Sequence, residues 1–163
     1  MTDFLVRALS PSDAVWVRAR IADHWGAAFV VVHSVVYYPD TLPGFAALED
    51  GRVVGLLTYT LADDACEIVS IDSERSGRGI GTALIDAAVG MAGAARCRRV
   101  WLITTNDNLD ALRFYQRRGF RLVAVYPNAV EAARLLKPQI PLVGDYGIPI
   151  RDELELEMPL QVP

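Results

Sequence analysis

Apolar residues recur along this chain in two periodic patterns, one typical of strands and one typical of helices. Short runs rich in β-branched, aliphatic and aromatic residues predict strands at 4–7, 45–49, 53–60, 67–71, 99–104, 120–125 and 153–160. Apolar residues at helical spacing predict helices from Ser10 to about Asp23, from Gly79 or Ile80 to Ala95, and over 109–118 and 128–136. The dipeptide Asp50-Gly51 predicts a tight hairpin turn between the second and third strands.

Two further stretches complete the predicted architecture. The segment from Ala27 to Tyr38 is dominated by β-branched and aromatic residues, so it favours another strand over a helix. Residues 137–149 are rich in Pro and Gly and predict a loop. The order strand, helix, strand over residues 67–104 predicts a parallel pair with a right-handed crossover. We therefore expect one α/β domain over residues 1–163, with a mixed sheet of six to eight strands.

The composition narrows the class of protein. A net charge of −4 argues against a nucleic-acid partner and mildly favours neutral or cationic substrates. Cys66 and Cys97 have no disulfide or zinc spacing, and two histidines are too few for a histidine-based metal site, so we predict no metal. No run of about eighteen apolar residues and no signal-peptide core is present. We expect buried thiols, no membrane partner and a cytoplasmic location.

The most informative stretch runs from Glu67 to Ala88 and reads strand, polar turn, three glycines and an Ala-rich helix. No Ser, Thr, Asp or Asn stands where a side chain would cap this helix, so its first N–H groups and positive dipole end are free. This arrangement favours a phosphate or pyrophosphate site. The loop lacks the Walker lysine and the dinucleotide spacing. Ordinary structural glycines, or a nucleotide or flavin phosphate ligand, remain alternatives.

Two blocks of residues carry a resemblance to a known family. Residues 71–85 resemble the acetyl-CoA signature of the GNAT acyltransferase superfamily, with Gly79 and Gly81 matching its two glycines and Ser76 standing where Arg or Gln is usual. A second block is similar to a later motif of the same family, and its sequence is Asn108-x-x-Ala-x-x-Phe-Tyr115-x-x-x-Gly-Phe120. The resemblance implies a mostly antiparallel sheet with a central splayed parallel pair and helices on both faces.

The resemblance also implies a role for each matched residue. The acetyl-CoA contacts that it implies lie at Ile71, Ser76, Gly77, Arg78, Gly79, Ile80, Gly81, Thr82, Asn108 and Tyr115. Within that set, a free N–H near Ile71 would polarise the thioester carbonyl, and Tyr115 would protonate the departing thiolate. An acidic residue in an apolar strand has a raised pKa when it is buried, which makes Glu67 the candidate general base.

The implied reaction is direct transfer of an acetyl group from acetyl-CoA to a primary amine of a small molecule or a peptide. A non-catalytic acyl-CoA sensor on the same fold is the alternative. The segments 27–38 and 126–152 depart from the family pattern where acceptor substrates usually bind, so the acceptor stays open. The apolar terminal strand either completes the sheet or helps to form a homodimer.

Overall fold

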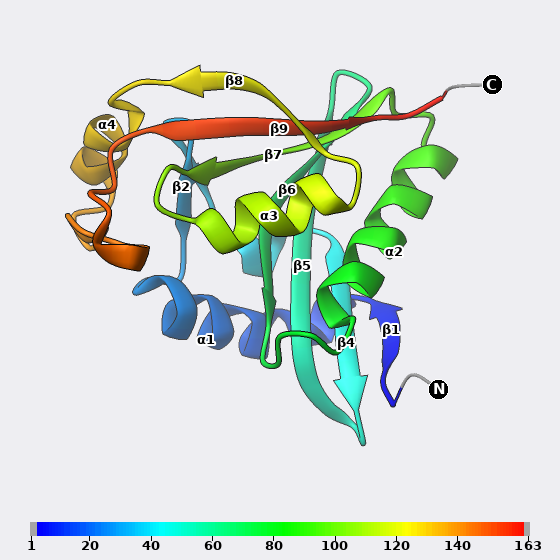
Figure 1. The fold of residues 1–163 in the computed structure, drawn as a ribbon. Coiled ribbons are helices and arrows are strands. Elements are labelled where there is room, and N and C mark those ends of the chain that lie inside the picture. The colour runs from blue at the N-terminus through cyan, green and yellow to red at the C-terminus, as the bar shows by residue number, and fades with distance from the viewer. Residues whose placement is uncertain (1–2, 162–163) are drawn as a thin grey trace.

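The computed structural model describes residues 3–161 as one mixed α/β domain (Figure 1). The strands are β1 (Leu5–Ala8), β2 (Val30–Val32), β3 (Val35–Tyr37), β4 (Gly44–Glu49), β5 (Arg52–Ala62), β6 (Ala65–Ser73), β7 (Arg99–Thr105), β8 (Arg121–Tyr126) and β9 (Glu153–Pro159). The helices are α1 (Ala14–Trp25), α2 (Ile80–Ala94), α3 (Leu109–Arg117) and α4 (Ala129–Leu136), with short 3-10 turns at Pro11–Asp13, Pro39–Thr41 and Asp145–Gly147.

Seven strands form the main sheet in the order β1-β4-β5-β6-β7-β9-β8. Every neighbouring pair is antiparallel except β6 and β7, which are parallel and joined through α2. This confirms the predicted strand number, the mixed sheet and the parallel pair. The hairpin around Asp50-Gly51 is confirmed as well, because both residues adopt the positive φ that such a turn requires.

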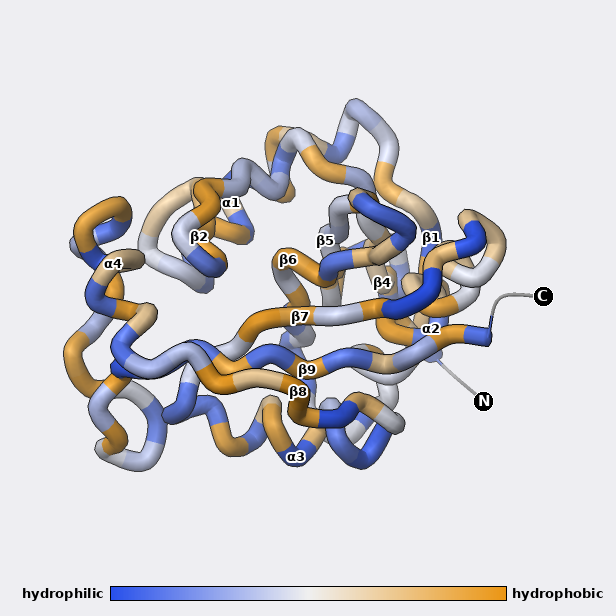
Figure 2. Tube along the Cα trace, turned by 90° about the horizontal axis from the view of Figure 1, so that it is seen from above, coloured by the Kyte–Doolittle hydropathy of each residue, from blue (hydrophilic) through white to orange (hydrophobic). Residues whose placement is uncertain are grey.

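Helices cover both faces of the sheet, as expected. A large buried cluster on one face joins α2 and α3 to the strands through Leu84, Ile85 and Tyr115, and a smaller one on the opposite face contains Val17 and Ile21 of α1. Seen from above, α3 lies on one side of the sheet and α1 with β2 on the other (Figure 2). Along α3 hydrophilic and hydrophobic residues alternate in that view, which is typical of a helix with one wet face. Cys66 and Cys97 are both buried free thiols in the larger cluster.

The preference for strand over helix at residues 27–38 is confirmed, but the prediction of one strand there is wrong. The segment folds into a two-stranded hairpin, β2 and β3, which is separate from the main sheet. His33 and Ser34 form its turn, both with positive φ. The dipeptide His-Ser is not one of the strong hairpin signals such as Asn-Gly or Asp-Gly, and the flanking residues are apolar on both sides, so the pattern gave no clear sign of a reversal. The hairpin lies on the α1 side of the sheet, next to β6.

Candidate functional site

The central feature of the site is a gap between the two parallel strands. β6 and β7 pair only from Ala65 to Ile68 and from Arg99 to Leu102, although β6 continues to Ser73 and β7 to Thr105. Beyond this point β6 stays paired with β5 and β7 stays paired with β9. The pairing of β5 with β6 shifts register there and leaves Val69 without an opposite residue, which is the pattern of a β-bulge. The parallel pair therefore splays open towards its carboxyl ends.

The glycine loop lies beside the open end of this gap. Gly77 and Gly79 both have left-handed backbone angles, with φ of 79° and 78°, and a Cβ built at either position would meet no atom within 4 Å. Gly79 precedes the first residue of α2, and no side chain caps that end of the helix. The loop is thus open at these two glycines and no side chain occupies the first N–H groups of the helix, which is the arrangement that favours an anion site.

Gly81 has a different role, which is to let two helices approach closely. A Cβ at this position would lie 2.9 Å from the ring of Phe114 on α3. Arg118 fixes the same junction from the end of α3, because its Nε donates to the hydroxyl of Thr82 at 2.7 Å and its guanidinium stacks over the Phe114 ring at 3.5 Å. The start of α2 and the last turn of α3 are therefore held together as one wall.

A cavity of about 670 Å³, here called the glycine-loop pocket, opens between this wall and the end of β6. Of the residues predicted to contact acetyl-CoA, it is lined by Ile71, Ser76, Gly77, Gly81, Thr82 and Tyr115. Three arginines that sequence reasoning missed, Arg113, Arg117 and Arg118, line it from α3. The signal was present as three cations within six residues of one short helix, but only the packing of α3 against α2 brings them to the loop.

The remaining predicted cofactor contacts are not among the residues that line this pocket, and their part in cofactor binding stays a prediction. Arg78 pairs with Glu49 at 2.9 Å, and Arg75 pairs with the same carboxylate at 3.4 Å. Ile80 is buried in the larger core cluster. Asn108 caps α3, where its side-chain oxygen accepts a hydrogen bond from the N–H of Ala111.

Tyr115 stands on α3 with its ring packed edge-on against Phe114 and Phe120. The residue is 7% exposed and lines the glycine-loop pocket. Its hydroxyl makes no hydrogen bond to any of residues 3–161. Burial raises the pKa of the Tyr115 phenol, so the group stays protonated at neutral pH and is able to donate its proton.

Glu67 lies on β6 in the closed part of the parallel pair, opposite Trp101. It is 6% exposed, and burial raises the pKa of its carboxyl group, as the sequence predicted. The hydroxyl of Tyr37 donates to Glu67 Oε2 at 2.8 Å and lowers that pKa in part. Burial and this contact raise the pKa of Tyr37 to about 12. Glu67 is not among the residues that line the glycine-loop pocket, and its part as a base stays a prediction.

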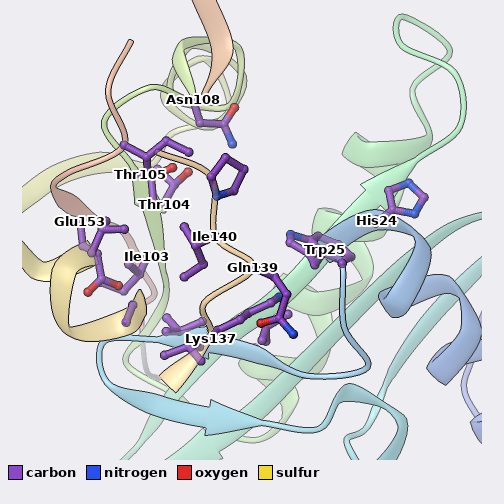
Figure 3. A pocket seen from close by; sticks show the side chains of 18 of the residues that line it. His24, Trp25, Ile103, Thr104, Thr105, Asn108, Lys137, Gln139, Ile140 and Glu153 are labelled. Atoms are coloured by element: carbon purple, nitrogen blue, oxygen red, sulfur yellow. The ribbon is translucent and has the colours of Figure 1, made fainter. Parts of the chain in front are cut away.

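A second cavity, of about 460 Å³, lies on the α1 side of the sheet and is here called the hairpin-side pocket (Figure 3). Val69 of the bulge and Ile103 to Thr105 of β7 form its contact with the gap, and Asn108 lies at its edge. Figure 3 shows Glu153 and Ile103 on one side of this pocket and His24 and Trp25 on the other. The two pockets thus approach the same gap from opposite faces of the sheet.

Two features, a membrane-spanning helix and a cluster of metal-ligating side chains, are absent from the part of the chain that the structure describes. No helix within residues 3–161 is long and apolar enough to cross a membrane. In the same range, no three His, Cys, Asp or Glu side chains are grouped so that they could hold a metal ion.

Comparisons with solved structures identify the fold. The chain superposes on a GNAT family acetyltransferase from Elizabethkingia anophelis with acetyl-CoA bound, with a TM-score of 0.70, 18% identity and coverage of 98% of this chain and all of that one. It also superposes on an IAA acetyltransferase from Bacillus cereus, with a TM-score of 0.68, 20% identity and coverage of 96% and 99%. The fold is therefore the GNAT fold, with its parallel pair at β6 and β7.

Comparison of sequences identifies the family. The profile of the Acetyltransferase (GNAT) family matches residues 16–120, which include both predicted motifs. The uncharacterized protein YxbD of Bacillus subtilis is 49% identical over 146 residues, covering 89% of this chain and 92% of the relative. The chain belongs to the GNAT acetyltransferase family.

Proposed function

We propose that this protein transfers an acetyl group from acetyl-CoA directly to a primary amine of a small molecule or a peptide. The observation that carries the proposal is the gap between β6 and β7, which residues of both pockets border from opposite faces of the sheet. The glycine-loop pocket adjoins a loop of the kind that binds phosphate groups, and the hairpin-side pocket is available for the second substrate. Two substrates that meet through one gap need no covalent enzyme intermediate.

The glycine-loop pocket has the properties that acetyl-CoA requires. The open space at Gly77 and Gly79 lets a diphosphate come within hydrogen-bond distance of the backbone. Arg113 and Arg117 of α3 line the same pocket and add positive charge. When bound there, acetyl-CoA supplies an activated acetyl group as a thioester.

The protein contributes binding, orientation and proton transfer. The N–H groups at the start of α2 would hold the diphosphate, and the end of β6 at Ile71 would present a backbone donor towards the gap. Tyr115 holds a proton at its phenol oxygen on the side of the glycine-loop pocket. Glu67 lines neither pocket, so it would take up the proton that the acceptor ammonium loses through water.

The test combines a binding measurement with a reaction. Thermal denaturation with CoA, NAD, ATP and FMN should show stabilisation by CoA above all, by about 2.7 kcal/mol at a hundredfold excess over Kd. Acetyl-CoA should then release free thiol when amines from a panel of small molecules and peptides are added. Stabilisation by CoA without thiol release for any amine would overturn the catalytic proposal in favour of an acyl-CoA sensor.

A matched pair of glycine variants tests the pocket itself. Gly79→Val places a branched side chain at a positive φ beside the helix start and should abolish stabilisation by CoA. Gly90→Ala lies on the exposed side of the same helix, meets no atom within 4 Å, and should leave CoA binding unchanged. Tight CoA binding by the Gly79 variant would show that the diphosphate binds elsewhere.

A further inference from the structure

The hairpin-side pocket is largely apolar but contains two buried groups of opposite charge. Its walls come from Val30, Val69, Ile103 and other apolar residues, and its volume lies within the range of small-molecule pockets. Lys137 follows α4, whereas Glu153 begins β9 (Figure 3). Each is 4% exposed, so neither charge is solvated by bulk water.

Glu153 uses only one of its carboxylate oxygens within the protein. Oε2 accepts a hydrogen bond of 2.9 Å from the backbone N–H of His33, in the turn of the β2–β3 hairpin. Oε1 is buried and has no hydrogen-bond partner. The imidazole Nδ1 of His33 lies 4.0 Å from Oε1, which is beyond hydrogen-bond distance. A buried carboxylate oxygen without a donor is costly, and a ligand that carries a donor removes that cost.

Lys137 is the only lysine in the chain. Its Nζ donates to the carbonyl oxygen of Phe29 at 3.0 Å and lies 5.5 Å from the centre of the Phe29 ring. No carboxylate within residues 3–161 forms an ion pair with it. Burial lowers the pKa of the Lys137 ammonium, since no negative group compensates for the lost water. An ammonium group has three donors, so Lys137 retains the capacity to bind an anion.

The pocket therefore holds a negative and a positive group that are both buried and are not paired with each other. A ligand that satisfies both must carry a hydrogen-bond donor for Glu153 and an anion for Lys137, and an ammonium group is the donor that also balances the charge of the buried carboxylate. We propose that the acceptor is an aminocarboxylate, an amino acid or short peptide whose ammonium binds Glu153 Oε1 and whose carboxylate binds Lys137. This inference rests on the proposed function for the reaction, but it concerns recognition alone.

The experiment compares acceptors that differ in one charge. The probes are the ω-amino acids from glycine to 6-aminohexanoate, each with its primary amide, measured for kcat/KM in thiol release. The same probes are titrated calorimetrically into the CoA-bound protein. The wild-type chain should prefer the acid of at least one length over its amide by about ten- to a hundredfold, as for a hydrogen-bonded charge pair. The length with the largest preference reports the separation of the two binding groups.

Three variants assign the preference to its residues. Lys137→Met keeps an unbranched chain without charge and should reduce the acid-to-amide ratio to about one. Glu153→Gln should lower kcat/KM for acid and amide alike by about tenfold or more. Glu131→Gln changes an exposed carboxylate on α4 and should have neither effect. Stabilisation by CoA in each variant confirms that it is folded.

The outcomes separate this inference from the proposed function. Equal use of acid and amide by the wild-type chain, or an unchanged ratio in Lys137→Met, would overturn the inference and leave amine acetylation intact. Calorimetric binding that favours the acids and depends on Lys137, without thiol release for any acceptor, would support the inference and overturn the proposed function. Absence of both binding and reaction with every probe would overturn the inference, and thiol release with the wider amine panel would then decide the proposed function.

Discussion

Replacing Tyr115 by Phe removes one oxygen atom from the glycine-loop pocket and leaves the packing of α3 intact. The phenol oxygen makes no hydrogen bond to residues 3–161, and the ring is held by its contacts with Phe114 and Phe120. The free energy of unfolding should therefore change by less than about 0.5 kcal/mol. Tyr115→Ala would instead lose a buried ring, at about 3–5 kcal/mol, and would confuse stability with activity.

The expected effect on activity is large. Loss of one general acid should slow the transfer by about 10- to 1000-fold, or about 1.4–4 kcal/mol in activation free energy. Stabilisation by CoA should stay close to the wild-type value, since the hydroxyl acts on the leaving group. Single-turnover measurement of thiol release is the appropriate assay, because it reports the chemical step and not product release.

Tyr59→Phe is the matched control for this change. Tyr59 is also a buried tyrosine on the α2 side of the sheet, stacked on Phe45, but it lines neither pocket. Its variant should react at the wild-type rate. If Tyr115→Phe and Tyr59→Phe gave equal single-turnover rates, the phenol would have no part in the chemistry.

Three further predictions concern stability. Gly81→Ala forces the new methyl group against Phe114 and should lower the free energy of unfolding by about 1–2 kcal/mol in urea titration; an unchanged value would mean that the ring moves freely. Arg20→Met removes the partner of Asp72, whose side chain is 6% exposed and accepts a hydrogen bond from Arg20 Nε at 2.7 Å. The loss should lower the free energy of unfolding by about 3–5 kcal/mol in the same assay. A loss below about 1 kcal/mol would show that water replaces the pair. Burial raises the pKa of Glu67 above its ordinary 4.5, so the folded chain binds this proton more tightly than the unfolded chain. The stabilising contribution is therefore complete below pH 4.5 and is lost as the pH rises through the native pKa. The free energy of unfolding, measured over a pH series, should lack this decline in Glu67→Gln.

Local sequence signals predicted the parts of the site that lie on one continuous segment. The bare glycine loop, the missing helix cap and the start of α2 all follow from residues 71–82, because glycine angles and capping are decided by neighbours in the chain. The parallel pair followed from the order strand, helix, strand. The burial of Glu67 followed from its apolar neighbours.

Features that depend on distant residues could not be predicted in this way. Val69 lies in an apolar run that looks the same with or without a bulge. The contact of Arg78 with Glu49 could not be predicted either, because Glu49 lies 29 residues earlier in the chain. The hairpin turn at His33 brings a backbone N–H to Glu153 across 120 residues, and no local pattern records that contact.

The short pairing between β6 and β7, from Ala65 to Ile68 and from Arg99 to Leu102, divides the main sheet into two parts, and we call it the seam. Four strands lie on one side of it and three on the other, and only four residue pairs connect the two halves. A small rotation about this seam would widen or narrow the passage between the substrates while every other pairing in the sheet stayed intact. The short pairing that creates the opening is thus also the only strand pairing within residues 3–161 that joins the two parts of the main sheet.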